Sequence, residues 1–135
     1  MIKKYVQGGL CDQGDGSRHK PYNSLILAQN DLIWSTLIVL SSPIPLVDGI
    51  TLRHGTKLIG EDNDNLPILS KNGVICNGIS HIENIYFKDT IGSSINYDNA
   101  TNITIKNVII TGHNKDLLLN QPDSELAGIH GKTTG

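Results

Sequence analysis

The sequence is poor in charged, aromatic and basic residues. Of its 135 residues 18% are charged and 4% are aromatic, and 11 basic side chains face 13 acidic ones. A net charge of −2 provides no basic surface for nucleic acid or for an anionic membrane, so we expect neither partner. A chain of this length buries a sufficient core without a metal ion or a disulfide, which predicts one domain over residues 1–135.

Long hydrophobic runs and paired cysteines are also missing. The most apolar region, Leu25–Leu40, is interrupted by polar residues and is too short for a bilayer span of about 20 apolar residues. Met1–Lys4 is basic, but no apolar core of a signal peptide follows it. We therefore expect a soluble protein that is cytoplasmic or associated with a virion. Cys11 and Cys76 predict a loop thiol and a small buried side chain, since two cysteines form no disulfide scaffold.

The amino-terminal third combines a turn-rich loop, a helix and a strand. Asp12–Lys20 holds Asp-Gly and other turn residues without the spacing of a phosphate-binding loop. Pro21–Asn30 has apolar residues at helical spacing after a proline that suits a first turn, which predicts a short helix. Leu32–Leu40 is mostly aliphatic and β-branched, which predicts a strand covered on both faces.

An internal repeat of 23 residues dominates the rest of the chain. Ile82–Phe87 and Ile105–Ile110 match in their apolar positions and in a central asparagine, and a weaker copy, Ile50–Ile59, lies about one period upstream. Short strands that recur at this spacing, with Asn and Gly between them, are typical of a β-solenoid whose coils stack on one another. A compact β-sandwich fits this repeat badly.

The repeated asparagine has a structural explanation. Asn tolerates the left-handed backbone conformation of a tight bend, and its amide can hydrogen-bond to the equivalent residue in the next coil. We therefore expect Asn84 and Asn107 to form two rungs of an asparagine ladder.

The chain resembles the pectin-lyase-like right-handed parallel β-helix superfamily. Gly14–Leu25 is similar to the family's amino-terminal entry, Asp48–Gly60 to its early coils, and the Ile-x-Asn-Ile repeat to its later ones, so that most of residues 14–112 are covered. The resemblance implies an all-β, right-handed parallel β-helix (a β-solenoid) of about four to five coils with a short N-terminal capping helix. It also implies relatives that act on acidic polysaccharides.

The catalytic motifs of those relatives are absent from the sequence. Hydrolases of the polygalacturonase type carry Asn-Thr-Asp, Asp-Asp, Gly-His-Gly and Arg-Ile-Lys motifs, to which Thr111–Asn114 and Gly128–Gly131 are only near misses. Pectate lyases combine calcium-binding carboxylates with an arginine base, whereas Arg18 and Arg53 both lie early in this chain. We therefore expect no catalytic residues.

Two sets of side chains are the alternative site candidates. His113, Asp116 and His130 carry the titratable groups of acid–base catalysis, although no carboxylate pair repeats at the coil spacing. Glu61, Asp62 and Asp64 place three carboxylates in four residues, a set of hard oxygen ligands for Ca²⁺, but they lack the glycine and distal glutamate of a calcium loop. A simple turn explains the acidic run equally, so we expect no cofactor, with Ca²⁺ as the alternative.

The function expected from the sequence is non-catalytic. A structural or carbohydrate-facing module of a surface or virion fibre is the first hypothesis, with polysaccharide as its partner. The alternative is a shortened polysaccharide lyase or glycoside hydrolase of the same superfamily. Leu126–Ile129 resembles the start of another strand, which predicts the N-terminal part of a longer solenoid, or a carboxyl end that is covered by self-association.

Overall fold

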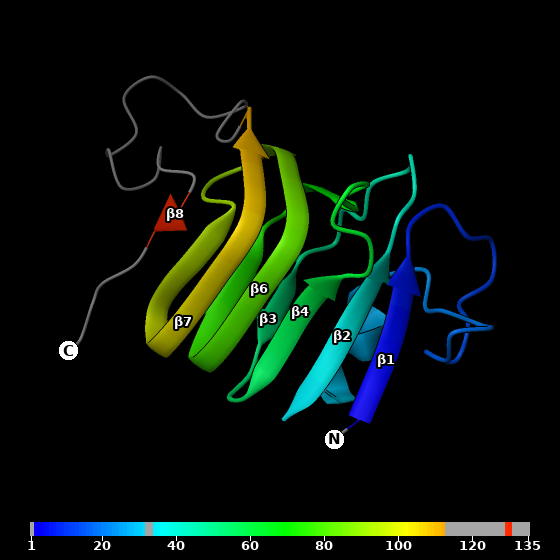
Figure 1. The fold of residues 1–135 in the computed structure, drawn as a ribbon, viewed down its shortest axis with the longest axis horizontal. Coiled ribbons are helices and arrows are strands. Elements are labelled where there is room, and N and C mark those ends of the chain that lie inside the picture. The colour runs from blue at the N-terminus through cyan, green and yellow to red at the C-terminus, as the bar shows by residue number, and fades with distance from the viewer. Residues whose placement is uncertain (1, 32–33, 113–128, 131–135) are drawn as a thin grey trace.

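The computed structural model describes residues 2–31, 34–112 and 129–130, and these form a parallel β-solenoid of about three turns (Figure 1). Every strand pairing in it is parallel. The strands are β1 (Ile2–Gln7), β2 (Ser35–Leu40), β3 (Ile50–Leu52), β4 (Thr56–Gly60), β5 (Ile68–Lys71), β6 (Val74–Thr90), β7 (Ile95–Thr111) and β8 (Ile129–His130). The predicted all-β solenoid is confirmed.

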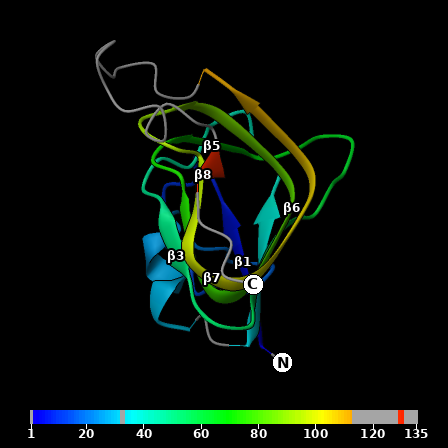
Figure 2. The ribbon, with the colours of Figure 1, turned by 90° about the vertical axis from the view of Figure 1, so that its left-hand side faces the viewer.

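The strands form three faces around one interior, as the view in Figure 2 shows. The first face runs β1-β2-β4 and continues into the middle of β6 and β7. The second joins β3 to the start of β6 and β7 and then to β8, and the third joins β5 to the end of β6 and β7. The two long strands therefore belong to all three faces and turn two corners each.

The predicted repeat sets the register of the stack. Ile82 pairs with Ile105, as the 23-residue spacing requires, and Leu58 in the upstream copy pairs with Ile82. Leu58 and Ile82 are fully buried, and Ile105 packs against the same core from the last long strand. Equivalent apolar side chains thus stack on one another along the interior.

The asparagine ladder is confirmed. Asn84 and Asn107 both have positive φ, 59° and 50°, at the bend between the first and third faces. The Nδ2 group of Asn107 donates to Oδ1 of Asn84 at 2.8 Å, and Nδ2 of Asn84 donates to the carbonyl oxygen of Gly60 at 3.1 Å. The ladder therefore connects three successive coils at one corner.

The predicted N-terminal capping helix is wrong. The structure has a six-residue 3₁₀ helix, η1 (Ile26–Asp31), that lies beside β3. Leu25, directly before η1, and Ala28 within it are fully buried, and their three-residue spacing matches a 3₁₀ turn rather than a longer α-helical stripe. Pro21 and the residue after it are not helical, because Tyr22 forms a parallel bridge with Val6.

The turn-rich loop covers the amino-terminal edge instead. The backbone N–H of Tyr5 donates to the carbonyl of Gly16 at 2.8 Å, and Gln7 donates to that of Tyr22 at 2.9 Å. Tyr22 in turn donates to the carbonyl of Tyr5 at 2.9 Å. The loop therefore satisfies backbone groups of β1 that a preceding coil would otherwise pair.

Two further expectations need correction. The described residues form about three turns rather than four to five coils, because the chain between β1 and β2 is a loop and a 3₁₀ helix rather than two more strands. The strand expected at Leu32–Leu40 begins at Ser35, and its outward residues Ile38 and Leu40 are half-exposed, so one face is covered fully and the other only in part.

The two cysteines differ in environment and give a first test of the fold. Cys76 is fully buried, and burial raises the pKa of its thiol to about 12, whereas Cys11 is exposed. Because the thiolate is the reactive form, we expect one thiol per native chain to react with an aromatic disulfide reagent at pH 8, and both to react in denaturant. Cys11→Ser should abolish the native reaction. Rapid modification of Cys76 in the folded protein would contradict its place in the core.

Candidate functional site

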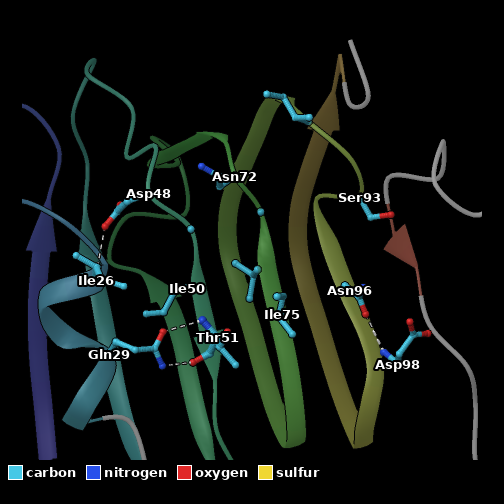
Figure 3. A pocket seen from close by; sticks show the side chains of 14 residues that line it. Ile26, Gln29, Asp48, Ile50, Thr51, Asn72, Ile75, Ser93, Asn96 and Asp98 are labelled. Carbon is cyan, nitrogen blue, oxygen red and sulfur yellow. Dashed lines mark hydrogen bonds between the residues drawn. The ribbon is translucent and has the colours of Figure 1, made fainter. Parts of the chain in front are cut away.

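A groove of about 460 Å³ crosses the outer side of the second face. It lies over β3 and the first residues of β6 and β7, with η1 along one side, as Figure 3 shows. Ile50 and Val74 are among its lining residues, and they are also buried members of the core. The groove therefore spans three successive coils and runs along the direction of stacking.

The groove repeats similar side chains at equivalent positions. Ile50, Val74 and Ile95 are aligned by the strand register, so Asp48, Asn72 and Ser93 occupy the same position two residues earlier in successive coils. Neighbouring strands are about 4.8 Å apart, which sets the spacing between rungs. One short polar side chain is thus offered per coil.

Side-chain hydrogen bonds attach η1 to the wall of the groove. The Gln29 amide donates from Nε2 to the carbonyl of Thr51 at 2.6 Å and accepts from its N–H at Oε1, 2.9 Å away (Figure 3). The carboxylate of Asp48 accepts the N–H groups of Ile26 at 2.7 Å and Leu25 at 3.3 Å. Gln29 therefore supplies β3 with the pairing that a further strand would give.

In each of the other two amide side chains of the groove, one polar atom is hydrogen-bonded to the backbone. Nδ2 of Asn72 donates to the carbonyl of Val47 at 2.8 Å, and Oδ1 of Asn96 accepts the N–H of Asp98 at 3.0 Å. These bonds orient the side chains, and within the described part of the chain no hydrogen bond engages Oδ1 of Asn72 or Nδ2 of Asn96.

Apolar side chains complete the groove. Ile26, Ile75 and Ile91 all line it and are exposed. The combination of fixed amides with exposed aliphatic groups suits a ligand that carries both hydroxyl groups and C–H surfaces.

The two carboxylates of the groove are badly placed for glycoside hydrolysis. Asp48 and Asp98 lie at opposite ends in Figure 3. The register aligns Asp48 with Ser93 two coils away, about 10 Å across the strands, and Asp98 lies five residues further along the chain, so the two carboxylates are more than about 10 Å apart. Glycosidases hold their carboxyl groups about 5–9.5 Å apart, so this pair is too widely separated to act as acid and base on one bond.

Two of the three carboxylates predicted as the alternative calcium site already have partners within the protein. Glu61 forms a two-point ion pair with Arg18, whose guanidinium also lies over the ring of Tyr5 at 5.6 Å. Oδ1 of Asp62 accepts the N–H of Asp64 at 2.9 Å. Among residues 2–31, 34–112 and 129–130, no three His, Cys, Asp or Glu side chains gather as a metal site.

The histidine and aspartate candidates fall mainly outside the described residues. His113 and Asp116 lie there entirely. The backbone of His130 pairs with Asn96, which brings β8 alongside the groove strands, but its side chain is outside the described part of the chain.

The groove residues were not predicted from the sequence, although a signal for them exists in it. Asp48-Gly49 and Asn72-Gly73 recur at the coil spacing and are followed by Ile50 and Val74. Read as a repeat rather than as separate turns, these pairs place Asp48 and Asn72 on one row of the solenoid surface.

Comparison with known proteins gives no assignment, since no family model, curated protein or solved structure matches the chain. The described residues contain no helix that is long and apolar enough to cross a membrane.

Proposed function

We propose that the protein is a non-catalytic, carbohydrate-binding β-helix module with the architecture of the pectin-lyase-like superfamily. An extended sugar chain lies in the groove over β3, β6 and β7, in the manner of a surface or virion fibre that contacts a polysaccharide. The observation that carries this proposal is the row Asp48, Asn72 and Ser93, which repeats one polar group per coil along an open groove.

The chemistry of the groove favours a neutral sugar chain. The Asn72 and Asn96 amides supply an acceptor and a donor for hydroxyl groups, and the exposed Ile75 and Ile91 contact the C–H surfaces of the rings. A rung spacing of about 4.8 Å is comparable to the length of one sugar unit, so consecutive rungs address consecutive units. The wide separation of Asp48 from Asp98 supports binding without cleavage.

Calorimetry with neutral hexasaccharides tests the groove. We expect binding of a β-1,4- or β-1,3-linked glucose hexasaccharide to weaken about tenfold in the double variant Asn72→Ala/Asn96→Ala, because two orienting hydrogen bonds are lost. Asn65→Ala, an exposed asparagine on the loop before β5, is the matched control and should bind normally.

The sugar should be recovered uncleaved after prolonged incubation, with or without Ca²⁺. Equal affinity of the double variant and the wild type, or no binding at all, would refute the groove as a carbohydrate site. Release of new reducing or unsaturated ends would support the alternative of a shortened hydrolase or lyase.

A further inference from the structure

Trp34 is an exposed aromatic side chain in a strained backbone conformation. It is the only tryptophan of the chain, precedes β2 directly and is 57% exposed. Its φ is +52°, a region that bulky residues rarely adopt. The fold therefore holds a large apolar ring outward at an energetic cost, and such strain is concentrated at functional sites.

The next coil forms a seat for this ring. Gly55 packs against the indole, since a Cβ atom there would lie 2.3 Å from Cε3 and 2.5 Å from Cδ2. The N–H of Trp34 donates to the carbonyl of His54 at 3.3 Å. The imidazole of His54 meets the indole edge to face, with centroids 5.0 Å apart and planes at 81°. One side of the indole is thus supported, and the exposed remainder faces solvent.

The following coil fixes His54 in turn. The N–H of Ile79 donates to Nδ1 of His54 at 3.3 Å, and a Cβ at Gly78 would lie 2.6 Å from the same nitrogen. Because Nδ1 accepts a hydrogen bond, the neutral ring carries its hydrogen on Nε2. A hydrogen-bond donor is therefore held next to the supported indole by residues from three successive coils.

We propose that Trp34 is a stacking platform for a single neutral pyranose ring, with Nε2–H of His54 as a donor to one of its hydroxyl groups. The C–H face of a sugar is electropositive and complements the negative face of the indole. Among the residues that the structure describes, Trp34 and Ile79 are the exposed large apolar side chains at this corner. The area of these two side chains is far below the roughly 800 Å² per partner that a protein interface buries. The platform rests on the proposed carbohydrate-binding function and adds a recognition position outside the groove.

Fluorescence reports on this position directly, because Trp34 is the only tryptophan. Titration with methyl β-D-glucopyranoside and methyl β-D-galactopyranoside should shift the emission of the native protein to the blue with saturation by one of them. In saturation-transfer NMR with the same glycoside, Trp34→Ala should weaken binding about tenfold, and Trp34→Phe should retain most of it. His54→Ala should weaken binding with the fold unchanged by circular dichroism.

Ile44→Ala is the matched control, because Ile44 is 54% exposed on the loop after β2, where it packs against Gly8 and Gly9 rather than against Trp34. It should leave glycoside binding unchanged. Gly55→Ala provides a second test, since the added methyl group displaces the indole while Trp34 itself is retained. It should reduce the emission shift as strongly as His54→Ala does.

The proposed platform and the proposed groove can be refuted separately. Hexasaccharide binding that depends on Asn72 and Asn96, with no emission change from either glycoside and no loss in Trp34→Ala, would overturn the platform and leave the groove. A saturable emission shift from a glycoside, with hexasaccharide binding indifferent to Asn72 and Asn96, would support the platform and overturn the groove. No response of Trp34 to any of these sugars would overturn the platform.

Discussion

Replacement of Ile82 by aspartate is expected to unfold the protein. Ile82 is fully buried, stacked between Leu58 and Ile105 in the centre of the solenoid. Loss of the buried side chain alone costs about 2–5 kcal/mol, and an unpaired buried charge adds several more. That total is comparable to the whole stability of a typical domain, about 5–15 kcal/mol, so the circular dichroism spectrum should lose its β signal at room temperature.

Two variants control this experiment. Ile82→Val keeps the shape of the core and should cost only about 1 kcal/mol in urea denaturation. Ile109→Asp introduces the same charge at an exposed outward position of β7 and should leave the fold intact. An Ile82→Asp protein with the melting temperature of the wild type would show that the stacked core is wrong.

Asn84→Ala is expected to lower the free energy of unfolding by about 2–4 kcal/mol. The substitution leaves the carbonyl of Gly60 without its donor inside the stack, which costs about 1–3 kcal/mol. It also forces alanine to adopt a positive φ, at about 1 kcal/mol or more. Urea denaturation monitored by circular dichroism measures the sum.

Further substitutions separate these two contributions. Asn84→Gly relieves the backbone strain but not the missing hydrogen bond, so it should be less destabilising than alanine. Asn84→Asp removes the donor and places a carboxylate against the carbonyl of Gly60, so it should be at least as destabilising as alanine. Asn107→Ala, at the exposed end of the ladder, should have a smaller effect. Equal stability of the alanine and glycine variants would show that the positive φ contributes nothing.

The solenoid could be predicted because its signal is carried by buried residues. Stacking places Ile82 directly against Ile105, so both must be apolar, and the bend between two faces requires a residue such as Asn84 in every coil. These requirements repeat at the coil spacing and are visible in the sequence. The capping helix was wrong because apolar residues at Tyr22 and Leu25 fit a helix equally well, and only the pairing of Tyr22 with β1 decides between them.

The candidate sites were less accessible to sequence analysis. Outward-facing side chains have no apolar periodicity, so the sequence did not single out Asp48 and Asn72 as site residues. Trp34 falls within Leu32–Leu40, which was predicted from its aliphatic and β-branched residues to be a strand covered on both faces. The position of Trp34 depends on two glycines in the following coils. Gly55 leaves room for the indole of Trp34, and Gly78 leaves room for His54, which contacts the indole.

The side-chain amide of Gln29 makes the two ends of the solenoid different. Together with the loop carbonyls of Gly16 and Tyr22 it occupies the backbone groups that an incoming strand would need at the amino-terminal end. At the other end, residues 103–111 of β7 pair with β6 alone among the described residues. A strand could therefore be added on the amino-terminal side only if these hydrogen bonds were broken first.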